Sequence, residues 1–81
     1  MTKSLFTKEY GIFLRHLRSA RGIAHLTQYE LAAKIGRTQS FVSKCERGER
    51  RVDVVELRHL CEGLGISLED FIRAFVKATS R

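Results

Sequence analysis

Four polar side chains are concentrated between residues 39 and 44 of the chain. They are Gln39, Ser40, Ser43 and Lys44. Each type can form hydrogen bonds to the edge of a DNA base: glutamine can bond N6 and N7 of adenine, lysine can donate to O6 and N7 of guanine, and serine can bond either kind of base. Two interpretations stand at this point: a set of base contacts, or the polar outer face of an ordinary solvated helix.

The sequence offers little for catalysis or metal binding. Nothing pairs a nucleophile with a base, so there are no candidate catalytic residues and no enzyme is expected. His16, His25 and His59 lie at no metal-ligand spacing with Cys45 or Cys61, and neither a metal nor a cofactor is expected. Both cysteines fall on apolar stripes of predicted helices. They are expected to be reduced core thiols; the alternative, a redox switch, needs a low thiol pKa and exposure.

The segment 27–47 is predicted to form two short helices joined by a tight turn. Thr27 and Glu30 form a Ser/Thr-x-x-Glu capping box that starts the first of these helices. Gly36 is expected to end it, because the left-handed residue that follows a helix strains any side chain with a Cβ atom. The inward residues of this helix are Leu31, Ile35 and the small Ala32, where the helices cross.

Thr38 is expected to cap the second helix of this segment. Val42 and Cys45 are its inward positions and lie three residues apart, so the four polar side chains at 39–44 point elsewhere. Two short helices joined by a glycine turn, with a polar outer face on the second helix, are typical of a helix-turn-helix that reads DNA.

A helix before this segment is predicted to cover about residues 8–21, with Thr7 as its cap and Gly22 as its end. Its stripe has the three- and four-residue spacing of an amphipathic helix. The stripe residues are Phe6, Tyr10, Phe13, Leu14 and Leu17.

Two more helices are predicted after the segment, following Gly48 and a short loop. The first starts at a capping box of Asp53 and Glu56 and is broken by Gly63 and Gly65, and Ser67 caps the second. Their inward stripes are Val54, Leu57, Leu60, Cys61 and Leu64 in the first, and Leu68, Phe71, Ile72 and Phe75, with Val76 beside them, in the second. With no proline and no alternating strand pattern, we expect an all-α chain of five helices.

Length and charge limit the remaining possibilities. A chain of 81 residues is expected to form a single domain, 1–81. The net charge is +6 and the pI near 9.9, which favours nucleic acid as a partner, although a basic solvated surface has the same charge. The excess of positive charge is uneven. Residues 1–25 carry five Lys or Arg and one acidic residue, whereas residues 53–81 carry four Lys or Arg and five acidic residues. No apolar run approaches a membrane span of ~18 residues, so a soluble cytoplasmic protein without membrane contact is expected.

The chain resembles the phage Cro and lambda-repressor type of helix-turn-helix protein, the XRE family, over about residues 10–73. The resemblance lies in Thr27-Gln28, Glu30-Leu31-Ala32, Gly36 and the run from Ser43 to Gly48. It implies a compact five-helix domain that places the helix of residues 39–47 in the major groove of double-stranded DNA. Base contacts are then assigned to Gln39, Ser40 and Lys44, with Ser43 as a further candidate.

The resemblance also implies phosphate contacts and a structural ion pair. The phosphate contacts are Thr27, Gln28, Arg37, Arg47, Arg50 and Arg51. For Arg37, which departs from the small or apolar residue usual at its position, simple solvation is the alternative. The ion pair joins Arg18 to Glu46. One departure from the family is the insertion of 23–25 between Gly22 and Leu26, which is expected to lengthen the first loop and to affect the placement of Gln28.

Two functions from different classes fit these features. The first is a dimeric repressor or autoregulator that reads an inverted-repeat operator. Its homodimer contact is expected from the last helix and tail, about 67–81, through Phe71, Ile72, Phe75 and Val76. The second is an antitoxin or other interaction module that holds a toxin or another protein, with DNA binding secondary.

Overall fold

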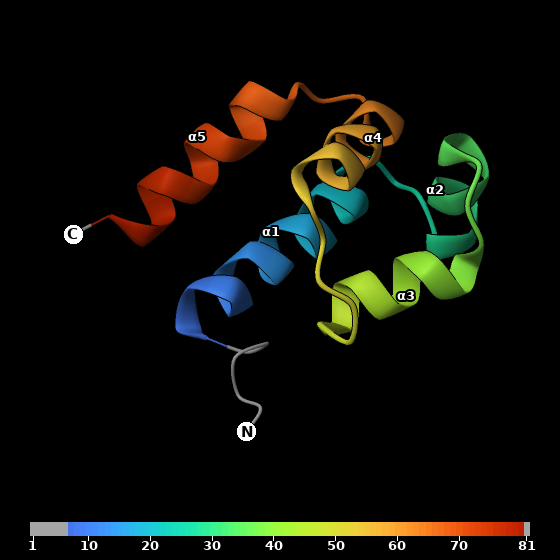
Figure 1. Ribbon diagram of the computed structural model, residues 1–81. Helices are drawn as coiled ribbons and strands as arrows, with labels where there is room; N and C mark the ends of the chain where they lie inside the picture. Colours follow the sequence, from blue (N-terminus) through green and yellow to red (C-terminus); the bar gives the residue numbers. More distant parts are fainter. Residues whose placement is uncertain (1–6, 81) are drawn as a thin grey trace.

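The structure is a computed structural model that describes residues 7–80 of the chain. Within this range the chain forms five helices and no strand (Figure 1). The helices are α1 Lys8–Ile23, α2 Gln28–Ile35, α3 Gln39–Arg47, α4 Val54–Leu64 and α5 Leu68–Thr79. The expectation of an all-α, five-helix domain is confirmed. Phe6, expected on the stripe of α1, lies outside the described residues.

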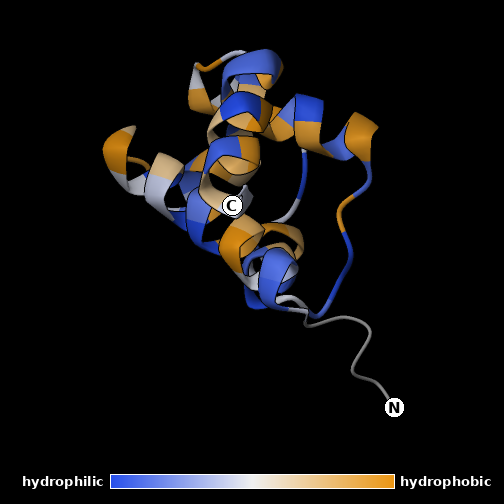
Figure 2. Cartoon of the chain, turned by 90° about the vertical axis from the view of Figure 1, so that its left-hand side faces the viewer, coloured by the Kyte–Doolittle hydropathy of each residue, from blue (hydrophilic) through white to orange (hydrophobic). Residues whose placement is uncertain are grey.

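The helices enclose one core. α2 contacts α3 and α4, while α1 contacts α3 and α5, so α1 and α4 separate the helix-turn-helix pair from α5 (Figure 1). Apolar and polar stretches alternate along the helices, as amphipathic helices around a shared core require (Figure 2). The buried residues are Phe13, Leu14, Leu17, Leu31, Ala32, Phe41, Val42, Cys45, Leu57, Leu60, Cys61, Leu64 and Phe71. Val54, expected on this inward side, is mostly exposed because it lies in the first turn of α4, ahead of the covered part.

Both cysteines lie in this core. Cys45 and Cys61 are free thiols and almost fully buried. Burial raises the pKa of each thiol to about 11, because the thiolate would lose its hydration. The prediction of core thiols is confirmed, and the low pKa and exposure that a redox switch needs are absent at both residues.

Each helix begins at the cap that the sequence predicts. The side-chain oxygens of Thr7, Thr27, Thr38, Asp53 and Ser67 accept a hydrogen bond from the main-chain N–H three residues later. The reciprocal bonds of the two capping boxes are also present, from Thr27 N to Glu30 Oε1 at 2.9 Å and from Asp53 N to Glu56 Oε1 at 3.2 Å. These boxes fix the starts of α2 and α4.

The end of α1 differs from the prediction. Gly22 lies inside the helix, which continues to Ile23, and His25 takes the left-handed conformation with φ 59°. The N–H of Leu26 donates to the carbonyl of Arg21 at 3.2 Å. The N–H of Arg37 makes the equivalent hydrogen bond to the carbonyl of Ala32 after α2. His25 therefore occupies the position that Gly36, Gly48 and Gly65 occupy after α2, α3 and α4.

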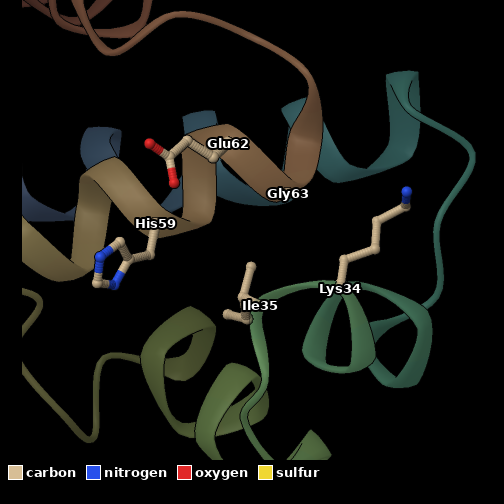
Figure 3. Close-up of a pocket in the computed structure, with 5 residues that line it drawn as sticks. All are labelled: Lys34, Ile35, His59, Glu62 and Gly63. Carbon is tan, nitrogen blue, oxygen red and sulfur yellow. The ribbon is translucent and has the colours of Figure 1, made fainter.

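Gly63 also lies inside its helix instead of breaking it. A Cβ at this position would lie 2.6 Å from Ile35 Cγ2 and 2.9 Å from Leu31 Cδ1. Figure 3 shows the side chain of Ile35, at the end of α2, pointing toward the turn of α4 that contains Gly63. The glycine therefore allows α2 and α4 to approach closely.

We expect Gly63→Ala to destabilise the fold by roughly 1–3 kcal/mol, because the new methyl group overpacks against the β-branched Ile35 and the buried Leu31. Gly22→Ala is the matched control: it lies inside α1 with nothing within 4 Å of the added Cβ. That substitution should stabilise by up to ~1 kcal/mol through helix propensity. Urea denaturation of both variants measures the effects. Equal stability changes would contradict the proposed close approach.

Candidate nucleic-acid interface

The outer face of α3 carries three of the four predicted base-contacting residues in an exposed position. Gln39, Ser40 and Lys44 are exposed, whereas Val42 and Cys45 of the same helix are buried. Ser43 is only partly exposed, and its hydroxyl accepts a hydrogen bond from Arg47 Nη1. The polar face predicted from the spacing is therefore present, with Ser43 already engaged by a neighbour on the same helix.

Behind this face lies a buried charge. Glu46, at 4% exposure, is the buried charged residue of the described chain. Its carboxylate accepts two bonds from Arg21, from Nε to Oε2 at 2.6 Å and from Nη2 to Oε1 at 2.9 Å. The hydrogen bond to Glu46 raises the pKa of Arg21. A bidentate pair of this kind joins α1 to α3 with fixed geometry.

The predicted partner of this carboxylate was Arg18, and that prediction is wrong. Arg18 Nη1 donates instead to the main-chain carbonyl of Glu46 at 2.8 Å. Carbonyls in the last turn of a helix have no partner within the helix, so this one is available to a guanidinium. Arg21 lies three residues further along the same face of α1 and also donates to the carbonyl of Leu26 at 3.0 Å. Arg21 therefore links the carboxylate of Glu46 to the connection between α1 and α2.

A chain of side-chain hydrogen bonds runs from Glu46 to the start of α3. Gln28 Nε2 donates to Glu46 Oε1 at 2.9 Å, and Gln39 Nε2 donates to Gln28 Oε1 at 2.7 Å. Neither this chain of hydrogen bonds nor the role of Arg21 is predicted from the sequence. The only available signal was that residues 18 and 21 share a face of α1, which does not distinguish between two arginines.

The insertion at 23–25 affects the interface less than its length suggests. Ile23 becomes the last residue of α1, and the connection to α2 is reduced to Ala24, His25 and Leu26. The cap at Thr27 forms, with its Oγ1 accepting from Glu30 N at 3.0 Å. Gln28, the first residue of α2, lies directly beside Gln39.

Aromatic rings hold the guanidinium groups of three arginines beside α3. Arg37 lies over the ring of Phe41, 3.7 Å from its centroid, and Arg50 lies 5.2 Å from the same centroid. Arg51 lies over the ring of Tyr10 at 4.4 Å. The hydroxyl of Tyr10 also accepts the N–H of Val52 at 3.0 Å, so α1 supports the loop after α3.

Arg47, the last residue of α3, is paired with Glu49 in the loop that follows. Its Nε donates to Glu49 Oε2 at 2.9 Å, and this bond raises the pKa of Arg47 and lowers that of Glu49. Both side chains are about half exposed, at 54%. Solvent screens such a pair, so Arg47 can exchange partners at little cost.

The four residues expected at a dimer contact on α5 differ in their exposure. Phe71 is 5% exposed and packs edge-on against Phe13 within the same chain, with ring centroids 5.8 Å apart. Phe75 is partly buried, with its ring centroid 6.2 Å from that of Phe13. Phe71 therefore belongs to the core, and Phe75 packs against the core while staying partly exposed. Ile72 and Val76 remain exposed, at 38% and 51%.

Among residues 7–80, none of the helices combines the length and the apolar character that a membrane span requires. The same residues contain no group of three or more His, Cys, Asp or Glu side chains that could hold a metal ion.

Known proteins share this arrangement. The family described as a helix-turn-helix domain matches residues 9–74. An uncharacterized HTH-type transcriptional regulator, y4dJ of Sinorhizobium fredii (strain NBRC 101917 / NGR234), is 38% identical over 60 residues, or 74% of each chain. The structure of an XRE-family like protein from Pseudomonas syringae pv. tomato str. DC3000 matches with a TM-score of 0.84 at 43% identity. That match covers 89% of this chain and 88% of the other.

Two further structures have lower identity. The clp gene regulator ClgR from C. glutamicum has a TM-score of 0.78 at 25% identity, covering 93% of this chain and 97% of the other. A variant of the restriction-modification controller protein C.Esp1396I has a TM-score of 0.81 at 22% identity, covering 88% and 95%. At 22% identity the likeness shows the fold.

The capped α2, the turn at Gly36 and the polar face of α3 define a DNA-binding helix-turn-helix. The chain belongs to the helix-turn-helix domain family and is of the XRE type. It is therefore a transcription regulator of a non-enzymatic, DNA-binding class.

We expect Glu46→Gln to reduce the free energy of unfolding by ~3–5 kcal/mol, because the substitution leaves the guanidinium of Arg21 without its counter-charge in a partly buried site. Glu62→Gln is the control, since Glu62 makes an exposed pair with Arg58 and should leave stability nearly unchanged. Chemical denaturation of both variants at neutral pH compares them. Similar, small losses for the two would refute a bracing role for Glu46.

Proposed function

We propose that this chain is a dimeric, sequence-specific repressor or autoregulator that reads an inverted-repeat operator with α3 in the major groove. The observation that carries the proposal is the exposed set of Gln39, Ser40 and Lys44 on a helix fixed from behind by Glu46. A reading helix must hold its side chains in register with base edges, and a braced helix loses less freedom on binding.

The direction of the hydrogen-bond chain supports adenine as the base that Gln39 reads. An ionised carboxylate only accepts, so Gln28 must present its NH₂ group to Glu46 and its carbonyl oxygen to Gln39. Gln39 then uses one N–H on Gln28 and keeps the other N–H and its carbonyl oxygen. One donor beside one acceptor is the pattern that pairs with N7 and N6 of adenine.

Phosphate contacts are proposed on both sides of α3. On the α2 side these are the Thr27 hydroxyl and the side-chain amide of Gln28. Both lie at the start of α2, where the positive end of the helix dipole attracts an anion. On the other side they are Arg47, Arg50 and Arg51, with Arg37 in the turn before α3. These contacts would position the protein on the duplex without distinguishing sequences.

The dimer contact is proposed to use the outer face of α5 through Ile72 and Val76, since Phe71 is buried in the core and Phe75 packs against it. A two-fold dimer places two copies of α3 about one turn of DNA apart. The competing function, an antitoxin or other module that holds a different protein, would use the same exposed apolar residues, so the partner on α5 separates the two functions.

Selection of bound duplexes from a random pool tests the central claim. We expect inverted repeats with half-site centres about 10 bp apart and an adenine at a fixed place in each half-site. Recovery of unrelated sequences, or of sites without two-fold symmetry, would count against a dimeric sequence reader.

Two substitutions separate the reading of bases from positioning on phosphates. Lys44→Ala should lose ~1–3 kcal/mol of discrimination at one base position and leave the others unchanged. Arg51→Ala should weaken binding to all sequences alike and reduce the slope of log affinity against log salt by roughly 1.8 per dimer. Binding curves at several salt concentrations, on the selected operator and on single-base variants, provide the data.

Arg58→Ala is the matched control for loss of positive charge. Arg58 is an exposed arginine on α4 that pairs with Glu62, so neither slope nor base preference should change. An altered base preference for Arg51→Ala together with an intact preference for Lys44→Ala would reverse the assignment.

Charge on the outer face of α5 should break the dimer. We expect Ile72→Glu with Val76→Glu to yield monomers and to weaken operator binding, because two carboxylates would face an apolar contact. Sedimentation at several protein concentrations measures the association. Ile23→Glu, an equally apolar exposed residue at the end of α1, is the control. If Ile23→Glu dissociates the dimer and the α5 variant does not, the interface does not lie on α5.

A further inference from the structure

Phe41 brings together two positive charges that lie far apart in the sequence. Arg37 precedes α3 in the turn after α2, and Arg50 follows α3 in the loop before α4 (Figure 1). Both guanidinium carbons lie near the Phe41 ring, at 3.7 Å and 5.2 Å from its centroid. Both distances are within the range of a cation–π interaction, ~6 Å.

The ring that holds these charges is itself fixed. Phe41 is 9% exposed and belongs to the hydrophobic core, on the third residue of a capped helix. Arg37 and Arg50 lie against the ring and are themselves exposed to solvent. The ring therefore forms a rigid surface that presents two guanidinium groups toward solvent.

Arg50 has a second restraint. One of its nitrogens, Nη2, pairs with Glu56 Oε2, while Glu56 Oε1 accepts the N–H of Asp53 in the capping box of α4. Glu56 is thus held by the start of α4 and restrains Arg50 in turn. This carboxylate engages one nitrogen of Arg50, and a guanidinium has five N–H donors, so others remain for a ligand.

Both guanidinium carbons lie against one ring, so the two positive charges are within about 9 Å of each other and repel, and Glu56 pairs with Arg50. An oxyanion bound by both arginines would offset that repulsion. Guanidinium forks match the oxygen geometry of phosphate, and restraint before binding reduces the entropy lost on binding. The arrangement therefore has the charge and the restraint that favour a phosphate ligand.

We propose that Arg37 and Arg50 bind one and the same phosphate of the DNA backbone, and that Phe41 is the positioning residue that makes the two arginines a single site. This inference rests on the proposed function, since it requires α3 to lie in the major groove. It assigns Arg37 to a phosphate and not to simple solvation, and it gives the aromatic residue of α3 a part in DNA binding that does not involve a base.

The test replaces single phosphates of the selected operator with uncharged methylphosphonates, one position at a time. Wild-type protein should lose affinity at one position per half-site next to the turn and the loop that flank α3. Arg37→Ala and Arg50→Ala should each lose the response at that same position and keep the responses elsewhere. Loss at two different positions would overturn the single site.

Salt dependence gives an independent measure of sharing. If both arginines bind one phosphate, the double variant should reduce the slope of log affinity against log salt by about as much as either single variant, roughly 1.8 per dimer. Additive reductions would mean two separate phosphates. Arg58→Ala again controls for charge and should leave the methylphosphonate profile unchanged.

Phe41→Leu tests the positioning role. Leucine keeps an apolar side chain in the core but removes the ring face, so the response to that methylphosphonate should fall while base preference stays as in wild type. Thermal melting identifies any loss of folded protein, and Phe41→Tyr, which keeps the ring, should restore the response. An unchanged response in folded Phe41→Leu would exclude Phe41 from the site.

These outcomes are distinct from failure of the proposed function. If wild-type protein selects no operator, the proposed function fails. If wild-type protein selects an operator and responds to methylphosphonates, but both arginine variants keep the full pattern, only the shared site fails.

Discussion

The remaining structure depends on the hydrogen bonds and the ion pair of the buried carboxylate of Glu46. The side chains of Arg21 from α1 and Gln28 from α2 donate to this carboxylate, and the side chain of Arg18 donates to the main-chain carbonyl of the same residue. A charge removed from water is stable only when its partners are in place. The packing of α1, α2 and α3 and the orientation of Gln39 at the surface therefore both require that the partners of Glu46 are in place. The core in this way keeps the interface rigid.

Local features of the sequence predicted most of the fold. Capping boxes at Thr27 and Asp53 and left-handed glycines at Gly36 and Gly65 depend on residues a few positions apart, so the sequence contains all the information that they require. The end of α1 was mispredicted because glycine is only the commonest residue in a left-handed position, and His25 takes that position while Gly22 stays helical.

Features that depend on three-dimensional packing were less accessible. The pairing of Glu46 with Arg21, and the burial of Phe71, are set by how deeply α1 and α5 pack against their neighbours. An apolar stripe on one helix shows that something covers it but not whether the cover comes from the same chain. The same limit hid the rings beneath Arg37 and Arg51, because a phenylalanine or tyrosine on a helix predicts core packing before it predicts support for a charge.

The narrow contact at Gly63 has a mechanical consequence for DNA recognition. With Ile35 and Leu31 against a residue that has only a hydrogen for a side chain, α2 has little space to slide or tilt on α4. The reading unit then behaves as a stiff body, and differences in groove width between operators must be absorbed by the duplex. Bending and twisting energies of the DNA at base pairs that the protein never touches would thus contribute to which sites it occupies.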